Sequence, residues 1–114
     1  MENCIFCRIV KGEIESNYVY KGENVIGIED KFPQAPKHYL LVSKKHIQDI
    51  TNLTDDDDET ITEMYRAVKK IAEEKKLTDL GFRTVINQGV HGGQTIYHLH
   101  MHIMGGRRMS WPPG

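Results

Sequence analysis

The sequence lacks any apolar run long enough to span a membrane, which takes about 20 residues in a helix. Its first ten residues, MENCIFCRIV, also lack the basic start and the longer apolar stretch of a signal peptide. An excess of either charge is missing too, because 15 Lys and Arg face 16 Asp and Glu for a net charge of −1. No general field therefore favours binding to nucleic acid or to an anionic membrane. These absences predict a cytoplasmic protein that recognises any phosphate group locally.

The length leaves little room for more than one domain. The 114 residues, of which 39% are hydrophobic, can bury one modest core. The sequence also contains no internal repeat and no low-complexity linker. We therefore expect a single domain over residues 1–114.

One long helix is predicted in the middle of the chain. Thr54 can cap its start, and the acidic run DDDDE that follows suits the positive end of a helix dipole. Apolar residues then recur at helical spacing and predict its buried face: Ile61, Met64, Tyr65, Val68, Ile71 and Ala72. A shorter helix is expected from about Cys4 to Lys11.

Five other segments have the composition of strands and lie between Gly, Pro, Asn or Asp residues: YVYKG, NVIGIED, HYLLVS, FRTVIN and YHLHMHIM. We expect a hairpin between the first two, with Gly22 in its turn. Pro33 and Pro36 break any helix in DKFPQAPKH, which predicts an extended loop. The fold class that follows is α+β, with an antiparallel sheet of about five strands.

The only two cysteines, Cys4 and Cys7, form a CxxC pair. In a reducing compartment this spacing is more often metal-binding or redox-active than a structural disulfide. A thioredoxin-like redox pair would follow a strand, and the residues before Cys4 supply none. A structural zinc ion needs four ligands, so zinc here would require two more from elsewhere, and histidines are the obvious supply.

Half of the six histidines stand at alternate positions of one short run. Alternate side chains of a strand share a face, so His98, His100 and His102 would lie opposite an apolar set that packs on the core: Tyr97, Leu99, Met101 and Ile103. The row could be a polar sheet face, or a catalytic metal site with an open water position. A third imidazole on one nearly straight strand lies too far away for that metal site, so no catalytic metal is expected. In the interpretation that uses every component, one imidazole joins the cysteines on zinc and the others act on a substrate.

The histidine run resembles the HxHxHxx signature, with hydrophobic x positions, of the histidine-triad (HIT) superfamily. Three segments, CIFCRIVKGEI, IEDKFPQAPKHYLLVSKKHI and INQGVHGGQTIYHLHMHIMGGRRMSWPPG, resemble the Hint branch, and with the helix between them they cover nearly the whole chain. The resemblance implies a HIT-like fold and a homodimer. It also implies hydrolysis of purine nucleoside 5′-phosphoramidates, such as adenosine 5′-monophosphoramidate or AMP-lysine, through a covalent nucleotidyl-histidine.

The resemblance implies roles for individual residues as well. His100 would attack phosphorus and His102 would contact the phosphate oxygens, so both are predicted catalytic and nucleotide-binding residues. Asp30 would bind the ribose hydroxyls, although an acid at such a position also commonly caps a loop. The other predicted nucleotide-binding residues are Asn87, Gly93, Gln94 and Thr95. Thr95 stands where many relatives have serine, and its hydroxyl can still donate to the phosphate or to the leaving group.

Relatives with the N-terminal CxxC bind zinc, and the matching ligands here are Cys4, Cys7, His46 and His98. Such a Cys₂His₂ set leaves no open position, so this zinc would be structural. The C-terminal WPPG resembles a tail that lies near the partner subunit's active site in relatives, with Ser110 here in place of their histidine.

Two alternative functions stay open. One is hydrolysis of dinucleoside polyphosphates, as in another branch of the superfamily, and the other is a nucleotide-binding or interaction protein with vestigial turnover. The choice between adenosine and guanosine also stays open, because apolar base pockets discriminate weakly between purines. His38 and His91 stand beside loops, where we expect both to be solvated, and neither receives a role.

Overall fold

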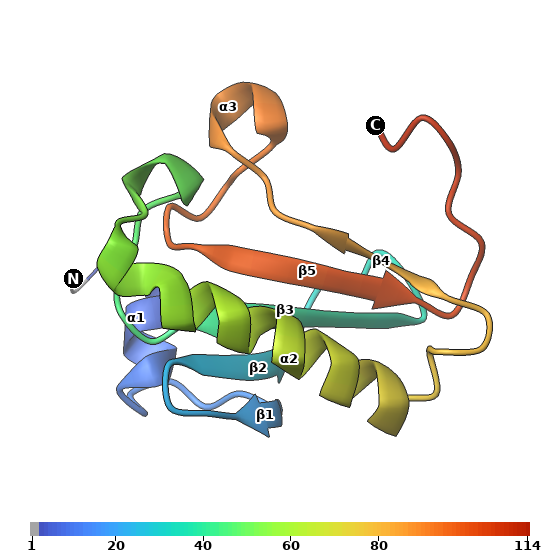
Figure 1. Cartoon of the computed structure of the whole chain (residues 1–114), viewed down its shortest axis with the longest axis horizontal. Helices are drawn as coiled ribbons and strands as arrows, with labels where there is room; N and C mark the ends of the chain where they lie inside the picture. Colours follow the sequence, from blue (N-terminus) through green and yellow to red (C-terminus); the bar gives the residue numbers. More distant parts are fainter. Residues whose placement is uncertain (1–2) are drawn as a thin grey trace.

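A computed structural model describes residues 3–114, and a five-stranded antiparallel sheet lies at its centre (Figure 1). The strands are β1 Tyr18–Lys21, β2 Val25–Glu29, β3 Lys37–Ser43, β4 Phe82–Val85 and β5 His100–Gly105, in the spatial order β1-β2-β3-β5-β4. The helices are α1 Ile5–Val10, α2 Asp58–Glu74 and α3 Gly89–Gly92, and two 3₁₀ turns, Ile50–Asn52 and Asp55–Asp57, precede α2. The expected α+β fold, with one long helix and a short N-terminal helix, is confirmed.

Because side chains alternate along each strand, the sheet has two faces, and a different helix packs on each. Helix α2 packs on one face over the larger core, which includes Val25, Leu41, Met64, Ile71, Leu99, Met101 and Ile103. Helix α1 packs on the other face, where Phe6 and Ile9 contact Ile26, Ile28, Leu40 and Val42. Because α1 has only six residues, it covers only part of this second face, and a cavity remains beside it.

Gly27 sets how closely α2 approaches the sheet. A Cβ atom at this position would stand 2.9 Å from the Cβ of Tyr20 and 3.3 Å from the Cδ1 of Ile71 on α2. Both separations are shorter than normal packing distances, so a larger residue would force the helix or the β1–β2 hairpin outward. The glycine inside the NVIGIED strand is therefore a packing requirement.

The apolar stripe of α2 is confirmed except at one position. Tyr65 is 57% exposed, so its predicted burial is wrong, whereas the other predicted members are buried or half-buried: Ile61, Met64, Val68, Ile71 and Ala72. Glu63 flanks the apolar stripe on the side opposite Tyr65 and is buried. Its carboxylate accepts hydrogen bonds from the Tyr20 hydroxyl (2.9 Å) and the Asn24 N–H (2.8 Å). Contacts with the β1–β2 hairpin therefore determine which side of the apolar stripe is buried.

Strand β5 begins three residues later than predicted. Tyr97 and His98 lie in a bend and regular pairing starts at His100, so the predicted strand start at Tyr97 is wrong. Tyr97 is 42% exposed and does not join the core, whereas Leu99, Met101 and Ile103 do. The bend also releases His98 from the alternation of β5, so its side chain is directed differently from those of His100 and His102.

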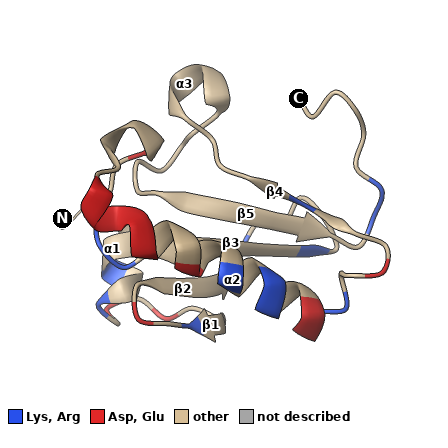
Figure 2. Cartoon of the chain, viewed as in Figure 1, with Lys and Arg blue, Asp and Glu red and all other residues tan. Residues whose placement is uncertain are grey.

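Charge is distributed unevenly although the net charge is near zero. Acidic residues gather at the start of α2 and occur again in its last turn, whereas basic residues lie between them on the helix and in the segment after β5 (Figure 2). Among residues 3–114, no helix combines the length and the apolar character that crossing a bilayer requires.

The start of α2 is held by one buried carboxylate. Asp57, 2% exposed, accepts hydrogen bonds from the backbone N–H of Thr54 (3.0 Å) and the ammonium of Lys45 (2.8 Å). Thr54 therefore caps this segment as predicted, although the first turn is 3₁₀ and the α-helix begins at Asp58. Hydrogen bonding to Lys45, followed by that to Thr54, lowers the pKa of Asp57 below the ordinary carboxyl value of 3.8.

We expect Asp57→Asn to lower the free energy of unfolding at about pH 7, where the carboxylate is charged, and to lower it much less at about pH 2. The stabilisation is present above the unfolded pKa and is lost as the pH falls through the lower folded pKa. Urea unfolding of both proteins across this range measures the difference. A difference between the two proteins that stays constant with pH would contradict the assigned role of the charge.

Candidate functional site

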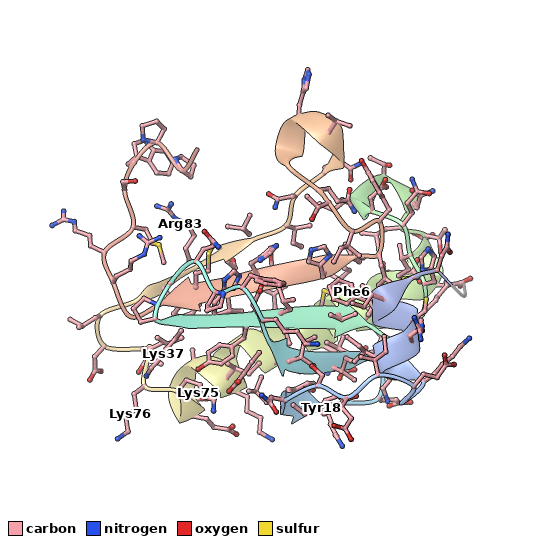
Figure 3. All side chains as sticks on the ribbon, turned by 180° about the vertical axis from the view of Figure 1, so that it is seen from behind. Phe6, Tyr18, Lys37, Lys75, Lys76 and Arg83 are labelled. Atoms are coloured by element: carbon pink, nitrogen blue, oxygen red, sulfur yellow. The ribbon has the colours of Figure 1, made fainter. Side chains whose placement is uncertain are left out.

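A cavity of about 330 Å³ opens on the α1 side of the sheet. Its apolar walls come from Ile5, Phe6, Ile9, Ile28, Leu40 and Ile96, and its polar end comes from Asp30, His38, Thr95, His100 and His102. Phe6 reaches from α1 toward the sheet (Figure 3), and its ring centroid lies 5.0 Å from that of His100. A larger groove of about 750 Å³ adjoins this cavity and shares Ser16, Glu29, Asp30 and Lys31 with it, but no histidine lines the groove.

His100 is held in one tautomer by the backbone. Its Nδ1 lies 2.7 Å from the carbonyl oxygen of His98, and because a carbonyl only accepts, Nδ1 carries the proton. Nε2 is then the unprotonated nitrogen, with a free lone pair. His100 is 8% exposed, and this burial lowers its pKa, so the ring is neutral near pH 7.

A chain of hydrogen bonds fixes His102 in the opposite tautomer. The Gln34 N–H donates to Nδ1 of His38 (3.0 Å), so in neutral His38 the proton lies on Nε2. That nitrogen lies 2.8 Å from Nδ1 of His102 and donates to it. The Nε2 of His102 therefore carries a proton and is a hydrogen-bond donor. Burial, together with His100 and His38 nearby, lowers the pKa of His102 to about 4.

His38 is the clearest correction to the sequence analysis. It is 6% exposed rather than solvated, and burial lowers its pKa, although the Asp30 carboxylate 3.4 Å away opposes that shift. A signal was present, because alternation in HYLLVS puts His38 on the same face as Leu40 and Val42. His91 is exposed, as expected.

Three ligand atoms from Asp30, His38 and His102 lie within 4.8 Å of one another, as a metal site would require. The 2.8 Å hydrogen bond between the two imidazoles already accounts for this closeness. The group is therefore explained by hydrogen bonding among its own members.

Asp30 both braces a loop and lines the cavity. Its Oδ1 accepts the N–H of Phe32 at 2.8 Å, which is the loop-capping contact considered from the sequence. Each carboxylate oxygen has a second lone pair, so this contact leaves Asp30 with acceptor capacity at the cavity wall. The capping role and a ligand-binding role are compatible.

Of the four predicted site residues in the glycine-rich segment before β5, one lines the cavity. Thr95 lines the cavity, and its hydroxyl makes no hydrogen bond within residues 3–114. Gln94 is buried, and its side chain is occupied by the N–H of Gly89 and the carbonyls of Gln48 and Ile96. Asn87 is half-buried and Gly93 ends the short helix α3 with φ +80°, and neither lines the cavity.

A second cluster joins α1 to the segments that flank β3 and β5. One ligand atom from each of Cys4, Cys7, His46 and His98 lies within 4.8 Å of the others. Nδ1 of His98 stands 3.2 Å from the Cys4 sulfur, 3.5 Å from the Cys7 sulfur and 3.1 Å from Nδ1 of His46. In a tetrahedral zinc site the ligand atoms are about 3.3–3.8 Å apart, as follows from the usual Zn–S and Zn–N bond lengths.

The protonation of His98 also suits a metal ligand. Its Nε2 lies 2.7 Å from the carbonyl oxygen of Ser43 and so carries the proton, which leaves the lone pair of Nδ1 directed at the cluster. His98 is fully buried, and burial lowers its pKa. The four side chains therefore fit a Cys₂His₂ metal site by distance, and His98 also fits by its protonation.

The C-terminal segment leaves the sheet beside β4. The guanidinium of Arg83 donates to the carbonyl of Ser110 at 2.9 Å (Figure 3). Arg83 is paired with Met104 of β5, and alternation places both on the face that carries His100 and His102. Trp111 is 83% exposed, so the end of the chain extends beyond this anchor.

The arrangement can be compared with known proteins. The family model described as "Scavenger mRNA decapping enzyme C-term binding" matches residues 3–111. An uncharacterized HIT-like protein of Synechococcus elongatus is 42% identical over 113 residues, covering 99% of this chain and 98% of the relative. An uncharacterized HIT-like protein of Chlamydia muridarum is 42% identical over 102 residues, covering 90% of this chain and 80% of that protein.

Solved structures agree with these relatives. A HIT family hydrolase from Legionella pneumophila has a TM-score of 0.95 and 44% identity, covering 98% of this chain and 100% of that chain. A histidine triad protein from Clostridium difficile has a TM-score of 0.92 and 38% identity, covering 96% of both chains. The paired histidines of β5, the five-stranded sheet and these matches lead to one conclusion. The chain belongs to the HIT-like superfamily.

Proposed function

We propose that this protein is a hydrolase of purine nucleoside 5′-phosphoramidates, of the Hint branch. One observation carries the proposal: neighbouring imidazoles of β5 are held in opposite tautomers at the polar end of one cavity. His100 offers a lone pair and His102 offers a proton. Substitution at phosphorus needs these two functions, a nucleophile and a donor to the phosphate oxygens.

The cavity suits a nucleoside monophosphate in one orientation. A purine would pack between the apolar walls of α1 and β2, where Phe6, Ile9 and Ile28 lie. The ribose hydroxyls would then donate to the Asp30 carboxylate, and the phosphate would lie against His100 and His102. Asn87, Gly93 and Gln94 lie outside the cavity lining, so we assign them to shaping the loop that carries Thr95.

The reaction proceeds in two displacements. Nε2 of His100 attacks phosphorus as the P–N bond breaks, and a nucleotidyl-imidazole remains. The departing nitrogen takes up one proton from solvent and leaves as the amine, and the later attack by water returns one proton to solvent. Nδ1 keeps its proton and donates it in a hydrogen bond to the carbonyl oxygen of His98, which stabilises the positive charge that develops on the ring. Nε2–H of His102 donates to a phosphate oxygen, and the hydroxyl of Thr95, which lines the cavity, would donate a hydrogen bond toward the departing nitrogen. Water then displaces His100 and releases the nucleoside monophosphate.

The Cys₂His₂ cluster is proposed to bind structural zinc through Cys4, Cys7, His46 and His98. Zinc bound there would link α1 to the segments beside β3 and β5. It would stabilise the fold and would take no part in the reaction. A reducing cytosol, which we propose as the location, would keep both thiols available as ligands. Because the carbonyl of His98 also orients His100, this crosslink would steady the nucleophile.

We further propose a homodimer. Strand β4 lies at the edge of the sheet, and Phe82 within it is 38% exposed. An unpaired edge with an exposed aromatic residue favours pairing with another strand. The C-terminal segment that Arg83 anchors extends beyond the same edge and could contact a second copy.

The first experiment is release of AMP from adenosine 5′-phosphoramidate. We expect His100→Ala to lower turnover at least about 10³-fold, because the nucleophile is lost. His91→Ala, which changes an exposed histidine outside the cavity, should retain the full rate. Mass spectrometry of the quenched wild-type reaction should detect an adenylyl group on His100. Equal or absent turnover in wild type and His100→Ala would refute the proposal, and faster hydrolysis of diadenosine polyphosphate would favour the alternative hydrolase.

Metal analysis tests the zinc proposal. We expect about one zinc per chain in protein purified without chelator. Cys7→Ser should lose most of the zinc and lower Tm by more than about 10 °C, since bound metal stabilises only the folded state. His91→Ala serves again as the control and should keep its zinc. A metal content near zero in the wild-type protein would remove the site.

Sedimentation equilibrium tests the homodimer. We expect a mass of twice the chain, 13.1 kDa each, at micromolar concentration. Thr84→Pro should shift the equilibrium toward monomer, because proline weakens pairing along an edge strand. A wild-type protein that stays monomeric throughout would contradict this part of the proposal.

A further inference from the structure

The turn that follows β5 packs against the loop between β2 and β3. The guanidinium of Arg107 donates through Nη2 to the carbonyl oxygen of Gln34 (3.0 Å) and through Nη1 to the carbonyl oxygen of Arg108 (3.1 Å). Beside it, a Cβ atom at Gly106 would stand 2.9 Å from the Cβ of Pro36, so the two backbones are packed as closely as glycine permits. Gly106 also has φ +90°, which favours glycine. The loop and the turn therefore form one packed unit.

Gln34 connects this unit to the catalytic face. Its carbonyl accepts from Arg107, and its N–H donates to Nδ1 of His38. Its side-chain amide donates to the carbonyl of Phe32 at 3.0 Å, which holds the residue from the loop side. Arg107 is thus the contact that fixes Gln34 from outside the loop.

Two contacts of His38 set the direction of the hydrogen bonds beyond Gln34. The Gln34 N–H occupies Nδ1, and the Asp30 carboxylate, whose Oδ2 lies 3.4 Å from Nε2, also favours a proton on Nε2. While the Gln34 N–H is in place, the His38 proton must lie on Nε2 and be donated to His102. If the N–H moves away, the His38 proton can transfer to Nδ1, and Nε2 can then accept from Nδ1 of His102. In that arrangement Nε2 of His102 has lost its proton and no longer donates into the cavity.

We propose that Arg107 is a positioning residue for His102, which acts through Gln34 and His38 to keep a proton on Nε2 of His102. Arg107 touches neither the cavity nor any histidine, so this role differs from binding or catalysis. The effect on turnover rests on the proposed function, whereas the effect on the His102 tautomer does not.

Long-range ¹H–¹⁵N spectra of the imidazoles test the tautomer directly in the substrate-free protein. The wild type should show His102 protonated at Nε2. Arg107→Ala should add a population with the proton on Nδ1, and Arg107→Lys, which retains one donor, should show a smaller one. Arg108→Ala removes the same charge from the adjacent residue, whose side chain makes no hydrogen bond within residues 3–114, and should match the wild type.

Kinetics with adenosine 5′-phosphoramidate supply the second readout. Loss of one exposed hydrogen bond predicts a kcat about 3- to 10-fold lower in Arg107→Ala, with KM nearly unchanged, because the donor acts mainly in the transition state. Arg107→Lys should recover part of the loss. Tm values within a few degrees of wild type would exclude general unfolding, and if Arg107→Ala does not fold, Arg107→Lys and Arg107→Gln carry the test.

An Arg107→Ala spectrum identical to that of the wild type would overturn the proposal, and so would equal tautomer changes in Arg108→Ala. If the wild type releases no AMP while the spectra change as expected, the proposed function fails and the positioning role of Arg107 stands.

Discussion

The antiparallel pairing of β3 with β5 is the contact on which both candidate sites depend. Its register sets Val42 opposite His100, Leu40 opposite His102 and His38 opposite Met104. Across the same pair, the residues on the other face complete the core beneath α2. The same pairing brings His46 to His98 beyond the strand ends and His38 to His102 within the sheet, so one ladder of backbone hydrogen bonds positions both the candidate metal-ligand set and the cavity-lining histidines.

Three imidazoles of one short run differ in which nitrogen carries the proton, because each meets a different hydrogen-bond partner. His98 donates to Ser43 and keeps the Nδ1 lone pair for the cluster, whereas His100 donates to His98 and keeps the Nε2 lone pair for the cavity. His102 accepts from His38 and keeps a proton instead. Burial keeps the rings neutral, so the hydrogen bonds alone decide which nitrogen of each ring offers a lone pair and which carries a proton.

The local features of this fold were largely predicted from the sequence. Helical spacing predicted α2, a short helix was expected where α1 lies, and alternation predicted the strands and the burial of Leu99, Met101 and Ile103. The errors lie where a local pattern is overridden by a distant contact. Tyr65 and Glu63 flank the same stripe, and only the hairpin at Tyr20 decides that the acid is buried. Tyr97 fits the alternation, yet the bend before His100 turns it to solvent.

By itself, the sequence determined the element types, the sheet class, and the residues with chemistry to offer, because helix and strand periods and ligand types are properties of short segments. The tertiary structure alone decided how those residues are used. His38 is 64 residues from His102, and local alternation indicates only that it shares a face with Leu40 and Val42, not which ring it meets. Tautomers depend on which carbonyl or N–H stands within about 3 Å of each ring nitrogen, and only the folded chain brings such distant groups together.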